Sequence, residues 1–351
     1  MSGIFQSDHR FLVTGAGGFI GGWLVKSLLD QGSHVRALIH RNALDVPPGF
    51  EAEGFFDHRR LEVESHDVTD IQQIDRLMQG CTHVFHLAAL ARNWTRDAGL
   101  FGRINIEGTR NVLTAARRHD VQKVVATSTY VTFGPSLPGQ LVNEHSRRSR
   151  PRFFNDYERT KHDAEALTLE FARQGLDVVI VCPTRVFGPG HLTESNSVAL
   201  LMHEYLSGRM PWLFNRGVNV GNYVLVSDVV EGHLLAMQKG ACGQRYILGD
   251  ENWSLRELAD QIDRISGRRH LRIPLWKAGP MLFSYVELMR AKLTGRHPKV
   301  TPGWMRMFMA DWACDCTRAR DELGYQPGGV AAGLEATYRW LESLESTRQR
   351  F

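Results

Sequence analysis

Tyr157 and Lys161 are the residues of this chain whose spacing most directly suggests chemistry. Side chains four positions apart on a helix lie on the same face, so a phenol and an ammonium group would stand together. The phenol can give a proton to a ketone oxygen as a hydride reaches the carbonyl carbon. A free phenol has a pKa of about 10, and we expect the Lys161 ammonium, together with the positive charge of an oxidised nicotinamide, to lower the pKa of Tyr157.

Two hydroxyl side chains precede this pair at the end of an apolar run. Residues 123–127 read as a strand, and Ser128 and Thr129 follow it. Thr129, or failing it Ser128, can donate a hydrogen bond to the alkoxide that forms. Taken singly, these residues also have an ordinary reading, as part of a turn or of an exposed helix surface. Their joint occurrence favours a catalytic set of Thr129, Tyr157 and Lys161, with Ser128 as the alternative hydroxyl.

A glycine-rich turn near the N-terminus predicts where a cofactor binds. The apolar run 11–13, the turn and the helix-periodic segment 23–29 read as strand, tight turn and helix, the arrangement that holds a dinucleotide pyrophosphate. Gly15 suits a sharp turn, Gly18 lets phosphate oxygens approach the backbone, and Gly21 lets the helix pack closely on the strand. The predicted pyrophosphate-binding residues are Gly15, Gly17, Gly18, Phe19, Ile20 and Gly21.

The run 33–39 reads as a second strand, and it ends in His40 and Arg41. A carboxylate at this position would bind both hydroxyls of the adenosine ribose, and this sequence has none there. His40 and Arg41, with Arg36 as a further candidate, would instead suit a 2′-phosphate, so NADP(H) is favoured over NAD(H). The alternative is that Arg41 is an ordinary surface residue at a strand end.

Two later strand ends are candidates for the rest of the cofactor site. Asp67 follows a third strand, and it could accept a hydrogen bond from the adenine amino group or cap the helix 71–78. The strand 83–87 runs into Ala88 and Ala89, whose small side chains leave room for a flat cofactor across the sheet edge.

Strand and helix patterns alternate up to residue 186 and become irregular beyond residue 187. Residues 177–182 form a continuous apolar run, as expected for a strand buried on both faces, and 223–226 looks like a return to the same sheet. We therefore predict an α/β fold, a Rossmann-type doubly wound parallel sheet with a smaller C-terminal substrate-binding lobe. The sheet domain is assigned to residues 1–186 and 222–249, and the lobe to 187–221 and 250–351.

Composition narrows the class of protein. A chain of 351 residues with 43% hydrophobic and 23% charged residues can bury a sizeable core, and a net charge of +4 gives no electrostatic reason to expect nucleic acid as a partner. No segment resembles a signal peptide or a membrane span, so we expect a cytoplasmic protein, with a homodimer as its assembly. Five cysteines do not form a paired set, and Cys314 and Cys316 lack a second pair of ligands, so no metal site is predicted.

With these motifs in hand, the chain resembles the extended short-chain dehydrogenase/reductase family, of the NAD(P)-dependent epimerase/dehydratase type, over nearly its whole length. The matching motifs are the turn Thr14 to Gly21, Asp67-Val68, His86-Leu87-Ala88-Ala89, Asn105-x-x-Gly108-Thr109, Thr129, Tyr157-x-x-x-Lys161 and Pro183-Thr184. The resemblance implies an adenine contact at Asp67 and the catalytic set Thr129, Tyr157 and Lys161. The further cofactor contacts that it implies are Val68, Leu87, Ala88, Ala89, Thr127, Pro183, Thr184 and Val186.

Within that family, two branches compete. One interconverts nucleotide-sugars, and the other looks like dihydroflavonol reductase and the 3β-hydroxysteroid dehydrogenases. Sugar epimerases usually carry an arginine where this chain has Gly221-Asn222, and their late phosphate contact has no clear counterpart near residues 314–320. We therefore expect an NADP(H)-dependent oxidoreductase that acts on a ketone or secondary alcohol of a bulky, largely apolar small-molecule substrate. A nucleotide-sugar epimerase or dehydratase is the alternative. A non-catalytic dinucleotide-sensing protein is an alternative of another class, and the presence of Tyr157 and Lys161 counts against it.

Two further segments have more than one interpretation. The apolar residues between 281 and 312 could form a lid over an apolar substrate, a packed core, a dimer face or a membrane-surface helix. The arginine-rich run 146–152 precedes Tyr157. A solvated loop is its default interpretation, and contact of Arg148 or Arg150 with an anionic substrate group is the sharper hypothesis.

Overall fold

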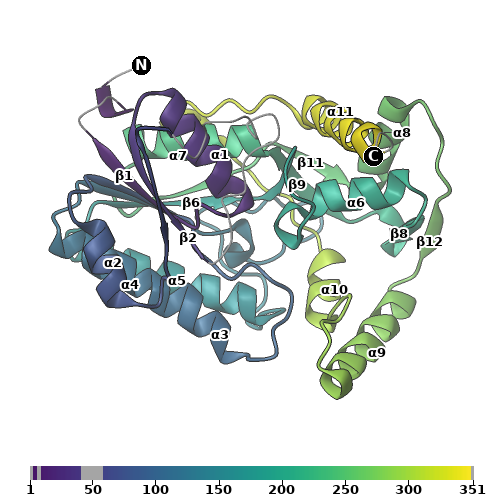
Figure 1. Cartoon of the computed structure of the whole chain (residues 1–351). Coiled ribbons are helices and arrows are strands. Elements are labelled where there is room, and N and C mark those ends of the chain that lie inside the picture. The colour runs from purple at the N-terminus through teal and green to yellow at the C-terminus, as the bar shows by residue number, and fades with distance from the viewer. Residues whose placement is uncertain (1–2, 6–8, 41–57, 349–351) are drawn as a thin grey trace.

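A seven-stranded parallel sheet organises the chain (Figure 1). The structure, a computed structural model, describes residues 3–5, 9–40 and 58–348. The strands lie in the order β10-β6-β5-β4-β1-β2-β3. Their bounds are β1 (Arg10–Thr14), β2 (His34–Ile39), β3 (Leu61–Ser65), β4 (His83–His86), β5 (Lys123–Thr127), β6 (Val178–Pro183) and β10 (Arg245–Leu248). The strand order reverses between β1 and β4, which is where sheets of this kind bind their ligands.

Helices cover both faces of the sheet, because every central strand carries apolar side chains on both sides. In β1, Phe11 and Val13 join one core cluster and Leu12 joins the other. On the first face lie α1 (Phe19–Asp30) and α7 (Val226–Lys239). On the second lie α2 (Ile71–Met78), α4 (Gly108–Arg118) and α5 (Asp156–Arg173), as Figure 1 shows. The predicted doubly wound α/β fold is confirmed.

The helix expected near residues 105–117 is longer and less regular than its sequence suggests. It begins as α3 (Gly99–Gly102), continues through a π-helical turn (Arg103–Glu107) and only then becomes α4. Within the π-helical turn, the Asn105 side chain accepts a hydrogen bond from the Leu90 N–H at 2.7 Å and donates one to Thr160 at 2.9 Å. The wider turn thus fixes the loop after β4 to helix α5.

The sequence analysis assigns residues 223–226 to the main sheet, but residues 223–225 belong to a second sheet and Val226 begins α7. In that sheet, β9 (Val220–Leu225) pairs in parallel with β7 (Arg185–Phe187) and antiparallel with β11 (Glu251–Ser254). The error arises because a short apolar run indicates burial but does not say which strand is its neighbour. The chain returns to the main sheet through α7 and β10, and β10 pairs with β6.

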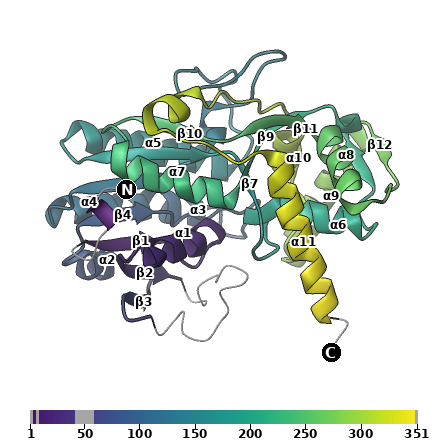
Figure 2. The ribbon, with the colours of Figure 1, turned by 90° about the horizontal axis from the view of Figure 1, so that it is seen from above.

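The π-helical turn Ala319–Leu323 packs against α7 and β10, whereas several of the remaining elements lie on the far side of the second sheet (Figure 2). They include α6 (Ser197–Leu206), α8 (Leu255–Ser266) and α11 (Val330–Arg348), which share a core with Phe187 and Tyr223, and the short strand pair β8 (Trp212–Phe214) and β12 (Ile273–Leu275). Two further helices, α9 (Ala278–Thr294) and α10 (Pro302–Phe308), pack against each other. No helix among the described residues is long and apolar enough to cross a membrane.

Candidate active site

The glycine turn after β1 lies against the end of β4. Gly15 has a φ of +71°, and a Cβ on it would lie 2.6 Å from the backbone nitrogen of Ala88. A Cβ on Gly21, in the first turn of α1, would overlap the carbonyl oxygen of Gly15. Both positions therefore require glycine for backbone packing, as the strand–turn–helix pattern predicts.

The start of α1 is built to receive an anion. Its N-cap residue, Gly18, is exposed and supplies no side-chain cap, and the first turn contains no acidic residue. The N–H groups of a first helical turn have no partner within the helix, so here they are available to a pyrophosphate. Gly17 and Ile20 are half-buried in this turn, and the buried ring of Phe19 packs against Gly190. These residues fit a dinucleotide.

At the ends of β2 and β3, His40 and Asp67 come together. The His40 Nε2 lies 3.6 Å from a carboxylate oxygen of Asp67, and both side chains are exposed. The other Asp67 oxygen accepts hydrogen bonds from the backbone and hydroxyl of Thr69. The cap of α2 is Asp70, which accepts from Gln72 and Gln73, so Asp67 does not cap that helix.

Arg36 and Arg41 were both predicted as candidates to bind the 2′-phosphate, and the structure tests one of them. Arg41 lies outside the described residues. Arg36 is wrong as a candidate, because its guanidinium donates to the Glu62 carboxylate at 2.8 Å and to the backbone carbonyls of Leu77 and Gln79. It points along the sheet toward β3 and the end of α2, so His40 is the member of this set that the described residues place at the strand end.

A buried chain of hydrogen bonds runs beneath the turn. Thr14 Oγ1 lies 2.7 Å from His86 Nδ1, and His86 Nε2 lies 3.0 Å from Thr109 Oγ1. Burial lowers the pKa of His86 to about 3, so it stays neutral and bridges two hydroxyls. Thr14 also accepts from the Ala88 N–H, while Leu87, Ala88 and Ala89 are half-buried at the strand end. The small side chains of Ala88 and Ala89 leave room at this edge, and their contact with a cofactor stays a prediction.

Helix α5 carries the proposed acid and its ammonium partner. Asn155 caps the helix by accepting from the Glu158 N–H, so the first turn and Tyr157 are held in place. Lys161 is buried and donates from Nζ to the Thr127 carbonyl at 2.7 Å. Burial lowers the pKa of Lys161 to about 8, and the Glu165 carboxylate opposes this shift. The structure thus ties α5 to the carboxyl end of β5.

The lowering of the Tyr157 pKa expected beside an oxidised nicotinamide stays a prediction, and the protein's own groups shift this pKa in the opposite direction. Burial raises the pKa of Tyr157 to about 12, and a hydrogen bond with Thr129 only partly opposes the shift. The Lys161 ammonium donates to the Thr127 carbonyl and is itself easier to deprotonate, so it does little for the phenol. Of the two charges expected to lower the pKa of Tyr157, the positive charge of an oxidised nicotinamide is the one that remains.

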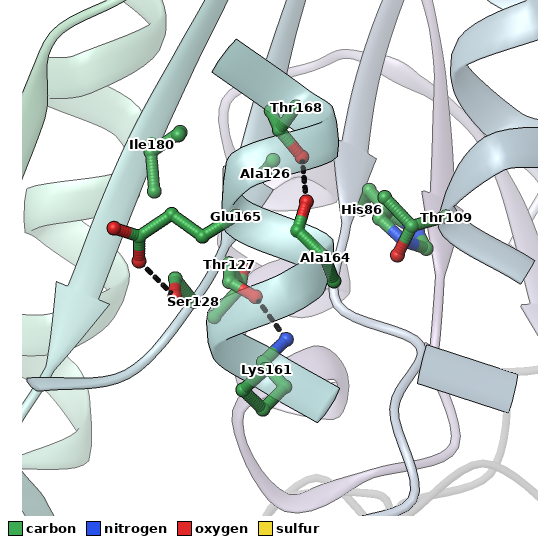
Figure 3. Close-up of a pocket in the computed structure, with 10 residues that line it drawn as sticks. All are labelled: His86, Thr109, Ala126, Thr127, Ser128, Lys161, Ala164, Glu165, Thr168 and Ile180. Carbon is green, nitrogen blue, oxygen red and sulfur yellow. Dashed lines mark hydrogen bonds between the residues drawn. The ribbon is translucent and has the colours of Figure 1, made fainter. Parts of the chain in front are cut away.

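Ser128 has a different role from Thr129. Its hydroxyl donates to the buried Glu165 carboxylate at 2.6 Å, as Figure 3 shows, so its proton is already used within the protein. Glu165 also accepts from Thr132 at 3.0 Å and from Arg245 at 3.0 Å. The sequence analysis missed Glu165, although its place four residues after Lys161 puts it on the same helix face.

Most of the other residues predicted to contact the cofactor have side chains that are buried or already hydrogen-bonded. The Thr127 hydroxyl pairs with His233 at 2.9 Å, so only its carbonyl faces Lys161. Val68, Pro183 and Val186 are buried, and Val68 packs against Gly108 of α4. Thr184 is the exception, because its buried Oγ1 has no hydrogen-bond partner among the described residues. A free hydroxyl there suits a polar group such as the nicotinamide amide.

The arginine-rich loop does not offer Arg148 to a substrate. The Arg148 guanidinium donates to the buried Glu158 carboxylate at 2.7 Å and to the Thr132 carbonyl at 2.9 Å. Arg150 stacks over the ring of Phe154. Arg148 therefore fastens the loop to the first turn of α5, and the anion hypothesis at this residue is wrong.

Replacing Glu165 with glutamine is expected to destabilise the protein by about 3 kcal/mol, because Arg245 loses its buried ionic partner. Urea unfolding followed by circular dichroism measures this change. Glu170→Gln is the matched control on the same helix, since Glu170 forms an exposed ion pair with Arg173 and should change stability by less than about 1 kcal/mol. Equal effects of the two substitutions would contradict the role given to Glu165.

Stability is expected to fall below pH 6.5, because three histidines are buried in neutral form. Burial lowers the pKa of His83 to about 4, of His86 to about 3 and of His233 to about 4. Below about pH 6.5 the unfolded chain binds protons that the folded chain does not, so stability is lost as the pH falls toward 4. Thermal unfolding between pH 7.5 and 4 measures this effect. The stability of His233→Gln should fall less steeply with decreasing pH than the stability of the parent protein. The exposed control His145→Gln should not, and equal slopes for all three proteins would refute this account.

The fold and the glycine turn define an NAD(P)-dependent enzyme of the extended short-chain dehydrogenase/reductase type. Residues 11–249 match the NAD dependent epimerase/dehydratase family, and the chain belongs to that family. It is 32% identical over 339 residues to a putative dihydroflavonol 4-reductase of Synechocystis, covering 95% of this chain and 94% of the relative. It is 32% identical over 341 residues to sterol demethylase protein B of Methylococcus capsulatus, covering 94% and 97%. The crystal structure of gox2253 superposes with a TM-score of 0.78 at 28% identity, covering 96% of this chain and 98% of that one.

Proposed function

We propose that this protein reduces a ketone, or oxidises the corresponding secondary alcohol, of a bulky and largely apolar small molecule with NADP(H). The observation that carries the proposal is the meeting of two features at one edge of the sheet. The glycine turn follows β1, and Thr129 follows β5 beside Tyr157 of α5. Since β1, β4 and β5 are neighbouring parallel strands, their carboxyl ends share that edge.

In this proposal the bound cofactor supplies the hydride, and the protein supplies the proton and the orientation. Tyr157 gives its phenolic proton to the substrate oxygen, and Thr129 donates a hydrogen bond to the same oxygen. The raised pKa of Tyr157 keeps the phenol protonated at neutral pH, which suits reduction. In the reverse direction, the positive charge of the oxidised nicotinamide is the main stabiliser of the phenolate, and Lys161, held by the Thr127 carbonyl, makes the smaller contribution.

The preference for NADP(H) rests on the cationic end of the second strand. We expect NADPH to bind at least about tenfold more tightly than NADH, because charge-assisted hydrogen bonds from His40 and Arg41 to a phosphate are strong. Fluorescence titration of the protein and of its His40→Ala/Arg41→Ala double variant measures both affinities. The double variant should lose NADPH affinity and keep NADH affinity. Equal binding of the two cofactors to the parent protein would overturn the preference.

The substrate class is inferred from the chain's departures from sugar epimerases, and two relatives named for a dihydroflavonol and a sterol support it. In the same proposal, residues 187–221 and 250–351 form the substrate-binding lobe of a cytoplasmic homodimer. Light scattering coupled to size-exclusion chromatography tests the dimer. A screen of cyclic ketones that follows the loss of NADPH absorbance tests the reaction.

A nucleotide-sugar epimerase or dehydratase is the second candidate, because the family to which the chain belongs includes both activities. Such a reaction returns the hydride to the sugar, so it leaves the NADPH absorbance unchanged. Product analysis of the same screen with nucleotide-sugars distinguishes it. Conversion of a nucleotide-sugar without net loss of cofactor, combined with no turnover of any ketone, would replace our proposal with this one.

A further inference from the structure

Arg185 is a half-buried arginine whose neighbours are neutral. It opens β7, directly after the strand-end residues Pro183 and Thr184. Its Nε donates to the Tyr130 hydroxyl at 3.2 Å and its Nη1 to the Tyr223 hydroxyl at 3.2 Å. The guanidinium also lies 5.5 Å from the centroids of the Tyr223 and Phe308 rings.

The charge on Arg185 is uncompensated within the described part of the chain. No carboxylate there lies within ion-pair distance of it, and its Nη2 donates to none of the described residues. Burial lowers the pKa of Arg185, but the Tyr130 and Tyr223 hydroxyls raise it by more, so the guanidinium stays charged. An arginine offers five N–H donors, and removing such a charge from water is costly unless a partner of opposite charge is supplied.

The position of Arg185 links it to the proposed catalytic residues. Tyr130 follows Thr129 in the chain, and its phenol is close enough to influence the pKa of Tyr157. On the other side, the guanidinium lies against β9 at Gly221, where a Cβ would be 2.9 Å from its Cζ. Arg185 therefore opens the second sheet and contacts Tyr130, the neighbour of Thr129 in the chain.

We propose that Arg185 is a substrate-recognition residue that binds an oxyanion group, carboxylate or phosphate, carried by the substrate. The planar fork of a guanidinium matches such a group with two parallel hydrogen bonds. The Tyr130 and Tyr223 hydroxyls accept from Arg185, which leaves their own protons free to donate to the same anion. This inference rests on the proposed function, since it concerns the substrate of that site.

Three aryl ketones that differ in charge test the inference by isothermal titration calorimetry: 4-acetylbenzoate, 4-acetylphenyl phosphate and neutral acetophenone. The parent protein should bind one or both anions more tightly than acetophenone, and the preferred anion identifies the group. Arg185→Gln should lose at least about tenfold in affinity for that anion and nothing for acetophenone, given the strength of hydrogen bonds to charged groups. Arg306→Gln, which changes an exposed arginine of α10, is the matched control and should bind as the parent does.

Binding is measured without turnover, so the result is separable from the proposed reaction. Equal affinities of the parent and Arg185→Gln for the anions, or no preference of the parent for either anion over acetophenone, would overturn the role of Arg185 and leave the proposed reduction standing. Tyr223→Phe removes one hydroxyl and keeps the charge, so it serves if the Arg185 variant does not fold. It should lower the affinity for the preferred anion by about threefold to tenfold, and an unchanged affinity would count against the site.

Helix α9 supports a second, independent inference, because its apolar face is turned outward. Six large apolar side chains of this helix are between 46% and 82% exposed, whereas Ser284 and Glu287 are buried. The exposed six are Leu282, Phe283, Tyr285, Val286, Met289 and Leu293. Most of them recur at helical spacing as one stripe. Met281 instead packs with Val300, Met305 and Met309, so the predicted apolar segment divides between a small core and this surface.

The charges around the stripe carry one sign. From Arg268 to Arg306 the sequence has nine lysine and arginine residues and a single acidic residue, Glu287, which pairs with Arg290. Lys292 in the last turn of the helix, and Lys277 and Lys299 outside it, are exposed. Two copies that met through this face would bring like charges together, which disfavours a dimer there. An outward apolar stripe bordered by lysine and arginine is the arrangement that binds an anionic membrane surface.

We infer that the α9 stripe docks the protein on the surface of an anionic lipid bilayer. Co-sedimentation with vesicles of phosphatidylcholine containing about 30% phosphatidylglycerol should capture the full chain, and pure phosphatidylcholine vesicles should capture at least about tenfold less. High salt should release the protein. The triple variant Leu282→Ser/Phe283→Ser/Val286→Ser should remain in solution.

The control Leu141→Ser/Val218→Ser removes two exposed apolar residues elsewhere and should bind the vesicles as the parent does. Failure of the parent to bind anionic vesicles would overturn the inference. So would conversion of a parent oligomer to a smaller species by the triple variant, because the stripe would then be a surface between copies of the chain.

Discussion

Replacing Tyr157 with phenylalanine is expected to lower kcat by about 10²–10⁴-fold, the usual contribution of a positioned general acid. The substitution removes one oxygen from a side chain that packs beside Phe154 and Trp312, so the surroundings should remain folded. The cofactor should still bind, because the glycine turn and the start of α1 are untouched. Single-turnover measurement of NADPH oxidation, with cofactor affinity measured separately, checks both halves of this expectation.

Tyr205→Phe is the control for this experiment. Its hydroxyl bonds Asp263 and Arg272 in the C-terminal part of the chain, far from α5, so its loss should affect stability and not kcat. A Tyr157→Phe variant that retained full activity would remove the phenol from the mechanism. A variant that also lost the cofactor would assign Tyr157 to binding instead.

Gly21→Ala is expected to weaken cofactor binding by more than about 100-fold and to destabilise the protein by about 1–3 kcal/mol, as inserting atoms into packed regions does. The added Cβ would overlap the carbonyl oxygen of Gly15 and lie 2.9 Å from Ala16 Cα. Both contacts are with backbone, so relief requires the turn to move, and the turn forms the proposed pyrophosphate site. Cofactor titration and thermal unfolding measure the two effects.

Gly102→Ala provides the matched control for that substitution. Gly102 is also helical, and a Cβ on it would meet nothing within 4 Å. Its replacement should be neutral or stabilise the protein by about 0.4–1 kcal/mol, because alanine restricts the unfolded chain more than glycine does. Similar losses in both variants would show that helix propensity, and not contact with Gly15, explains the effect.

The fold could be predicted from local sequence patterns because apolar residues recur with a regular period in the central strands and helices. The helix 71–78 and the strand 33–39 were located to within a residue, since each has a run of apolar residues with one period. The second sheet was not located, because β7 has only three residues and the sequence does not state which strand β9 joins. The π-helical turn before α4 also left no signal, since its residues would suit an ordinary helix.

Residue type and spacing along the chain were enough to identify a Rossmann-type fold, a glycine turn that only small residues satisfy, and a tyrosine and lysine on one helix face. Those features depend on backbone sterics and helical period, which are local. Contacts between distant segments decided the rest. They determined which hydroxyl faces α5 and which arginine is already paired. They also determined which side of α9 is exposed to solvent. Ser128 and Thr129 are adjacent in sequence, yet the first donates to Glu165 and the second to the Tyr157 side, because only packing decides where neighbouring side chains point.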